Sequence, residues 1–268
     1  MSFEAALRFV ERYGDELERH RIRYLFCGAG DDAVLLRYME QLQNEDGGFP
    51  FNLEKGKDSS VNETCGILAI LEELNLKESI VCRKAVDYVF VVQGEDGSWD
   101  ENAEIRKYNP PFWDVPGDPK TKMWLTGEIT RLLIKLDYRE TKQVKKAADF
   151  ILRHQENDGR FAGFRISTWL AIAIFGQLRG FDDRIVGEAL KIIEDWVDET
   201  NDASFLIWYL QCLMDGGIPK DHPILRKCLG KLMKLHQENG SWTSADGERY
   251  RVSTTISALK LAKECGLW

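Results

Sequence analysis

The sequence lacks the features of several large protein classes. Its longest apolar run, Trp169–Phe175, falls far short of the roughly 20 residues that a membrane-spanning helix needs. The six cysteines include no Cys-x-x-Cys pair and no regular spacing, which argues against a disulfide framework. Since no signal-peptide pattern is present, we expect reduced, mostly buried thiols in a cytoplasmic protein. The net charge of −8 disfavours nucleic acid and anionic membranes as main partners, but peripheral membrane contact to collect a lipid is compatible with it.

Strand signals are also missing, because no period-2 stretch is bounded by hairpin turns. Instead, two kinds of helical segment alternate along the chain. Residues 144–152 carry an apolar stripe at every third or fourth position, with charged residues on the other face. Residues 166–175 are apolar nearly all round, which is typical of a helix buried on every side. Two concentric rings satisfy this alternation, with amphipathic helices outside and apolar helices inside.

A short phrase recurs between these segments. It has Asp-Gly three residues after Gln and an aromatic residue at its end, and it occupies Gln43–Phe49, Gln93–Trp99 and Gln155–Phe161. A copy that is one residue shorter and has Asn in place of Asp occupies Gln237–Trp242. The polar stretch Trp196–Asp202 falls midway in the longest gap and predicts a degenerate unit. We interpret the phrase as structural. Asp-Gly forms a tight turn, Gln bonds backbone groups left open at the helix end, and the aromatic residue plugs the space between helices.

The phrase resembles the repeats of squalene/oxidosqualene cyclases and protein prenyltransferase β subunits, from about residue 33 to the C-terminus. The resemblance implies an all-α fold, an α/α toroid of five to six helix pairs in a single domain 1–268. Residues 1–26 would form N-terminal helices, and 27–268 the repeat units. It also implies a prenyltransferase- or terpene-cyclase-like protein that acts on or binds an isoprenoid, or its diphosphate, in an aromatic-lined central cavity.

The catalytic signatures of these families are absent. No Asp-x-Asp-Asp acid motif occurs, and the Asp-Asp pairs at 31–32 and 182–183 do not extend to Asp-Asp-x-x-Asp. No Asp-x-Cys accompanies Cys65 or Cys212, so the sequence offers nothing that matches the prenyltransferase zinc site. Mg²⁺ is compatible with the composition, but the carboxylates cannot be grouped into a metal site from the sequence. The cofactor is therefore left unassigned.

Two predicted inner-helix starts carry similar pentapeptides, Phe164–Thr168 and Tyr250–Thr254, each with Arg in second place. Arg165 and Arg251 would then stand beside free N–H groups at helix N-termini, which favours binding of an anion such as diphosphate. Lys122, near the start of another inner helix, could join them. The alternative is that both arginines pair with loop carboxylates while Ser and Thr cap their helices.

Three tryptophans fall near the starts of successive inner helices, at Trp124, Trp169 and Trp208. In a toroid these positions line the cavity near its mouth. Aromatic walls suit an isoprenoid chain and can stabilise a carbocation. They also suit stacking against sugars, and large aromatic residues pack in any core.

Candidate acids lie in and after the proline-rich loop 101–121, the longest interruption of the helical pattern. Asp114 and Asp118 could act as acid, base or metal ligand, or could be solvated residues of a stiff surface connection. Glu128 falls within an apolar inner helix, where burial would raise its pKa unless Arg131, three residues on, pairs with it.

Three functions therefore stay open. An isoprenoid-handling enzyme would bind diphosphate through Arg165, Arg251 and Lys122, and surround the hydrocarbon with the three tryptophans. A carbohydrate-active toroid would use facing carboxylates from Asp114, Asp118, Glu128 and Asp202. A non-catalytic binding or scaffold toroid would have a lumen without convergent polar groups. The sequence does not indicate an oligomeric state.

Overall fold

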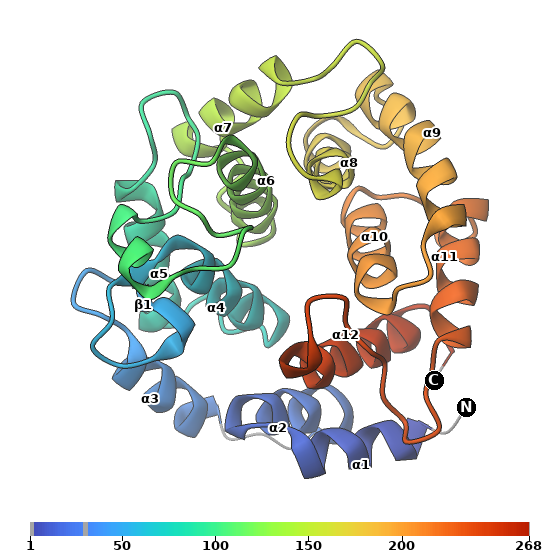
Figure 1. The fold of residues 1–268 in the computed structure, drawn as a ribbon, viewed down its shortest axis with the longest axis horizontal. Coiled ribbons are helices and arrows are strands. Elements are labelled where there is room, and N and C mark those ends of the chain that lie inside the picture. Colours follow the sequence, from blue (N-terminus) through green and yellow to red (C-terminus); the bar gives the residue numbers. More distant parts are fainter. Residues whose placement is uncertain (1–2, 29–31, 268) are drawn as a thin grey trace.

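The computed structural model describes residues 3–28 and 32–267, so Asp31 lies outside the described residues. The described residues form a ring of helix pairs, coloured in chain order in Figure 1. Six outer helices are α1 (Phe3–Tyr13), α3 (Asp32–Leu42), α5 (Ile80–Val91), α7 (Lys142–Arg153), α9 (Arg184–Glu199) and α11 (Pro223–Lys234). Each precedes an inner helix, and the inner helices are α2 (Glu16–Ile22), α4 (Val61–Glu73), α6 (Pro119–Lys135), α8 (Arg165–Arg179), α10 (Ala203–Asp215) and α12 (Arg251–Glu264). The predicted all-α toroid is confirmed, at the upper end of the expected number of pairs.

Little else is regular. Two short strands, β1 (Phe49–Pro50) and β2 (Ser59–Ser60), pair antiparallel. Short stretches of π or 3₁₀ helix occupy Arg23–Cys27, Phe51–Leu53, Ala103–Tyr108 and Glu248–Tyr250. No helix formed by the described residues has the length and apolarity needed to cross a membrane.

The two layers differ in burial as the periodicity predicts. In inner helix α8, every residue from Ser167 to Gly176 is buried. In outer helix α7, burial is confined to one stripe, made of Val144, Ala147, Ala148, Phe150 and Ile151. The apolar stripe therefore faces the inner ring, and the charged face of α7 meets solvent.

The predicted degenerate unit exists, but its turn is shorter than expected. Helix α9 continues through Trp196 to Glu199, and α10 begins at Ala203. Only Thr200–Asp202 connects them. The prediction of a turn over Trp196–Asp202 was wrong for its first half, because the acidic residues there occupy the exposed face of the last turn of α9.

The repeated phrase forms the same turn each time. The side chains of Asp46, Asp96 and Asp158, and of Asn239 in the short copy, each accept a hydrogen bond from the backbone amide two residues later, at 2.9–3.1 Å. Gly97 has φ +92°, and a Cβ there would lie 2.5 Å from the Lys146 carbonyl oxygen of α7. Glycine is needed both for the left-handed backbone and for this close approach.

Each phrase is also anchored to its neighbours. The backbone amides of the four aromatic residues donate to threonine hydroxyls on the following inner helices, as Phe49 to Thr64, Trp99 to Thr126, Phe161 to Thr168 and Trp242 to Thr255. Gln43 and Gln93 donate to carbonyls of the next outer helix, at Val81 and Gln143. The expected bond to a group left open at the helix end is found for Gln237, which donates to the Leu235 carbonyl at the end of α11, whereas Gln43 and Gln93 join adjacent repeats.

The ring closes on α1 and α2. Helix α12 packs against both of them, and Gly240 of the last phrase lies so close to α1 that a Cβ would be 2.3 Å from the Ala5 carbonyl carbon. Arg21 Nε of α2 donates to Glu73 Oε1 of α4 at 2.8 Å. Figure 1 shows the resulting closed circle, with α1 and α12 side by side.

Candidate functional site

Two adjoining cavities occupy the lumen of the ring. One, of about 530 Å³, lies where the inner helices begin, and the other, of about 650 Å³, lies towards their ends. We call them the aromatic cavity and the charged cavity after the residues that line them. They share the lining residues Asn62, Trp124, Trp208, Gln211, Ser253 and Ser257, so the two cavities form one lumen.

Aromatic side chains dominate the wall of the aromatic cavity. Trp124 from α6, Trp169 from α8 and Trp208 from α10 all line it, and the structure thus brings the three predicted tryptophans together. The rings of Trp124 and Trp208 meet edge to face with centroids 5.9 Å apart. The proline-rich loop adds Phe112 and Trp113 to the rim. Such a wall offers an apolar surface with ring faces available to a bound ligand.

Asp114 lies directly behind this wall. Its neighbour Trp113 and its partner Asn62 both line the aromatic cavity, and the Asn62 side-chain amide donates to Asp114 Oδ2 at 2.9 Å. Asp114 Oδ1 is buried and has no hydrogen-bond partner among the described residues. Burial, followed by the nearby Glu101 carboxylate, raises the pKa of Asp114 to about 7. A buried carboxyl group with such a pKa can hold and donate a proton near neutral pH.

Glu101 positions the loop that carries Asp114, although no pattern in the sequence points to it. Its carboxylate accepts hydrogen bonds from the backbone amides of Val61 and Asn62 at 2.7 and 3.0 Å and from the Ser60 hydroxyl at 2.9 Å. Glu101 therefore caps α4 from the neighbouring repeat. The cap holds the start of the loop beside Asn62. Further along the same loop, Asp114 accepts its hydrogen bond from Asn62.

The predicted anion site is not assembled. Arg165 lines the aromatic cavity, but its guanidinium pairs with Glu199 at 3.4 Å. Arg251 donates to the Ser241 hydroxyl at 2.9 Å and pairs with Glu248 at 2.8 Å. Both arginines thus pair with carboxylates, as in the alternative, but no side chain caps α8 or α12, so the Ser and Thr caps of that alternative are not found.

Lys122 and Asp118 lie away from the aromatic cavity. Lys122 lines a separate hollow of about 380 Å³ beside Asp96 and Asp100. Asp118 caps α6, accepting from the amides of Lys120 and Thr121 at 2.6 and 3.3 Å. Neither residue shares a cavity with Asp114 or the tryptophans, so the structure separates Asp118 from the candidate acid.

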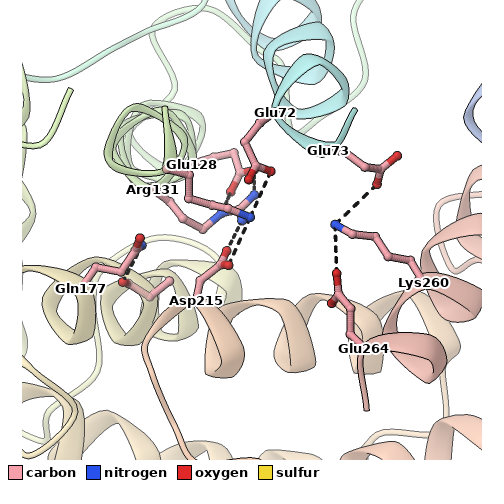
Figure 2. Close-up of polar contacts among 10 residues, drawn as sticks. Glu72, Glu73, Glu128, Arg131, Gln177, Asp215, Lys260 and Glu264 are labelled. Carbon is pink, nitrogen blue, oxygen red and sulfur yellow. Dashed lines mark hydrogen bonds and ion pairs between the residues drawn. The ribbon is translucent and has the colours of Figure 1, made fainter. Parts of the chain in front are cut away.

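Glu128 belongs to an ion-pair network at the charged end of the lumen (Figure 2). Arg131 Nε donates to Glu128 Oε2 at 2.8 Å and the guanidinium also pairs with Asp215 of α10. Lys135 extends the network, at 3.2 Å from Asp215 and 3.1 Å from Glu72 of α4. Although burial acts to raise it, Arg131 and Lys135 hold the pKa of Asp215 below its usual range. Glu128 is thus held as the buried partner of Arg131, which was one of the two roles expected for it.

A second network lies across the same cavity. Lys260 of α12 is 3.7 Å from both Glu73 and Glu264 (Figure 2). Arg21 of α2 also pairs with Glu73, at 2.8 Å. Cations and carboxylates alternate through both networks and are paired with each other. The charged cavity therefore presents matched charges, and these pairs link α2, α4, α6, α10 and α12.

The carboxylates proposed for glycan chemistry do not face one another. Asp202 caps α10, Asp118 caps α6, and Glu128 lies in the charged cavity away from Asp114. Within the described residues, no three His, Cys, Asp or Glu side chains come together in a group that could hold a metal ion.

The sequence matches no family model and no curated protein. Solved structures do share the fold. A protein from Actinoplanes aligns over 98% of this chain and 99% of its own, with a TM-score of 0.66 and 14% identity. The type II terpene cyclase MstE from Scytonema aligns over 98% of both chains, with a TM-score of 0.64 and 11% identity. A variant of MstE in complex with its substrate, geranylgeranyl dihydroxybenzoate, gives a TM-score of 0.64 and 12% identity over 99% of this chain and 97% of its own. The chain thus has the terpene-cyclase-like toroid fold.

Proposed function

We propose that the protein binds an isoprenoid chain in the aromatic cavity and cyclises it by proton transfer from Asp114. The observation that carries this proposal is the juxtaposition of a tryptophan-walled cavity with a buried carboxyl group whose pKa lies near 7. The substrate and product complexes solved for MstE support the same class of ligand in a toroid of this shape.

In the proposed reaction, a carbon–carbon double bond of the substrate takes the proton of Asp114. A carbocation forms on the chain and Asp114 becomes a carboxylate. Attack by a second double bond closes a ring, and loss of a proton ends the reaction and allows Asp114 to be protonated again. Trp124, Trp169 and Trp208 line the cavity in which the cation forms, and their ring faces stabilise positive charge.

Asn62 separates the acid from the cavity, since it lines the cavity and donates to Asp114. In the proposal its amide turns aside when the substrate binds. The cyclase chemistry is favoured over diphosphate transfer, because Arg165, Arg251 and Lys122 do not converge on one site.

Incubation with farnesol and geranylgeraniol in D₂O, followed by mass spectrometry of the products, tests the chemistry. A cyclic product that carries one solvent deuteron is expected. Asp114→Asn should lower its rate by about 10²–10⁴-fold, the usual contribution of a general acid. Asp183→Asn, at the cap of outer helix α9, is the matched control and should leave the rate unchanged. Undiminished cyclisation by Asp114→Asn would exclude Asp114 as the acid.

Occupancy of the lumen can be tested separately from chemistry. Gly66 of α4 lines the charged cavity, and a Cβ there would meet nothing within 4 Å. Gly66→Phe should fill part of the lumen and weaken binding of geranylgeraniol in a thermal-shift titration. Gly230→Phe, on exposed outer helix α11 with equal space around its Cβ, should not. Equal binding by both variants would show that the ligand does not extend from the aromatic cavity into the charged cavity.

A further inference from the structure

The buried tryptophans fall into two groups that differ at the indole nitrogen. Trp99 and Trp242, which end repeat phrases, donate their indole N–H to backbone carbonyls of the preceding outer helix at 2.7 and 2.8 Å. Trp124 and Trp169, which line the aromatic cavity, are 9% and 1% exposed, yet their indole N–H groups have no partner among the described residues. Since buried donors are almost always paired, two unpaired donors beside one cavity point to a ligand atom that accepts from them.

Uncharged polar side chains without hydrogen-bond partners also line the lumen. Gln211 and Ser257 line both cavities at their junction, and neither side chain has a hydrogen-bond partner in the part of the chain that the structure describes. Both can donate to an oxygen atom without carrying charge. Neutral donors therefore line the same lumen as the two tryptophans with unpaired indole groups.

Charged groups of the aromatic cavity do not suit an anion. Arg165 is paired with Glu199 at 3.4 Å, and Asp246 adds a carboxyl group to the lining. A diphosphate would meet no converging cations in this cavity. Burial of an anion without paired cations is strongly unfavourable, whereas an uncharged oxygen needs only a donor.

We propose that the isoprenoid ligand carries an uncharged oxygen group, such as a hydroxyl, carbonyl or ether, which accepts hydrogen bonds from the indole N–H groups of Trp124 and Trp169. Gln211 and Ser257 complete its surroundings. This inference rests on the proposed function, since it names the class of head group that the same cavity selects.

The test compares three ligands that share one chain: geranylgeraniol, geranylgeranyl diphosphate, and the hydrocarbon that ends in methyl in place of the hydroxymethyl group. Isothermal titration calorimetry on the full chain should give the alcohol an affinity roughly tenfold above the other two, the difference that one or two hydrogen bonds supply. In Trp124→Phe and Trp169→Phe, the alcohol should lose most of this advantage, while the affinity for the hydrocarbon changes less than about twofold.

The control for these variants is Trp99→Phe, which removes an indole N–H that is already paired with Val89. It should leave the ligand preference unchanged and lower Tm by more than the lumen variants do, because all three lose buried ring volume but only Trp99→Phe also loses a hydrogen bond. Tightest binding by the diphosphate, or equal binding of alcohol and hydrocarbon, would overturn the inference and leave the isoprenoid site standing. Failure of all three ligands to bind would overturn the proposed function itself.

Discussion

The backbone amide of Trp99 donates to the hydroxyl of Thr126 at 2.9 Å, although 27 residues separate them in the chain. The same bond recurs in the other three phrases, over separations of 15, 7 and 13 residues. Each joins the turn after an outer helix to the inner helix that follows. A buried amide is satisfied in this way at every phrase, so the threonine belongs to the repeat as much as the glutamine does.

Replacing this threonine should destabilise the protein. Thr126→Val keeps the shape of the side chain but leaves the buried Trp99 amide unpaired, which should lower the free energy of unfolding by about 1–3 kcal/mol. Thr130→Val is the matched control, because the Thr130 hydroxyl donates only to the Thr126 carbonyl and its loss leaves no amide unpaired. Urea denaturation measures both. Equal losses would show that the phrase bond adds nothing specific.

Alanine at two glycines should change stability in opposite directions. Gly97→Ala places a side chain at φ +92° and against the Lys146 carbonyl, so it should destabilise by at least about 1–2 kcal/mol from the backbone alone. Gly187→Ala lies in outer helix α9 with open space at its Cβ, and should stabilise by up to about 1 kcal/mol. Thermal denaturation of the two variants measures both changes in stability. A loss at Gly187 would contradict the packing described for the outer ring.

Removal of the central cation of the lumen network should be costly. Arg131→Met leaves Glu128 and Asp215 without their shared partner in a buried site, and should lower the free energy of unfolding by about 3–5 kcal/mol. Arg184→Met breaks the exposed pair with Glu188 and should change it by at most about 1 kcal/mol. If chemical denaturation gives similar values for both variants, the network does not bear on stability.

Stability should fall with rising pH because of Asp114. Its pKa of about 7 in the folded protein lies above the ordinary value of 3.8, so between these limits the folded state holds a proton that the unfolded state has released. The contribution of this group is fully present below about pH 4 and is lost as pH rises through 7. The loss amounts to about 4 kcal/mol, because each unit between the two pKa values corresponds to about 1.4 kcal/mol. Activity should decline above the same pH, since the acid is then ionised.

Asp114→Asn provides the comparison, because the amide resembles the protonated carboxyl group and cannot ionise. The free energy of unfolding of both proteins is measured from pH 5 to pH 8. Over this range the value for the parent protein should fall relative to the value for the variant. Parallel curves would show that Asp114 does not carry the expected pKa.

The periodic features of the fold could be predicted from the sequence, while contacts of variable spacing could not. The alternation of amphipathic and apolar segments, and the Asp-Gly turn, repeat at positions that align with one another. The threonine anchors do not, since loops of different length set them at different distances from the aromatic residue. The degenerate unit was found by its position, but its boundaries were obscured because a polar helix end resembles a turn.

The candidate site likewise contains residues that could be predicted from the sequence and residues that could not. The tryptophans could be predicted, since they occupy equivalent places on successive inner helices. Asp114 was one of several loop carboxylates, and only its burial against Asn62 and Glu101 distinguishes it from Asp118. The echoed arginines suggested an anion site, but each has a glutamate from another turn or helix as its partner. The Arg165–Glu199 pair spans 34 residues and depends on tertiary structure, whereas Glu248 lies only three residues before Arg251, so that pair is local.

Closure of the ring has a consequence for the order of synthesis. Ala6, Phe9 and Val10 of α1 are buried, and α12, made some 240 residues later, packs against that helix. During translation the apolar stripe of α1 must wait for the end of the described chain before its final neighbour exists. A ribosome-stalled chain that stops before α12 should therefore bind chaperones or aggregate. Helix α1 is therefore the first of the described helices to be synthesised and among the last to complete its packing.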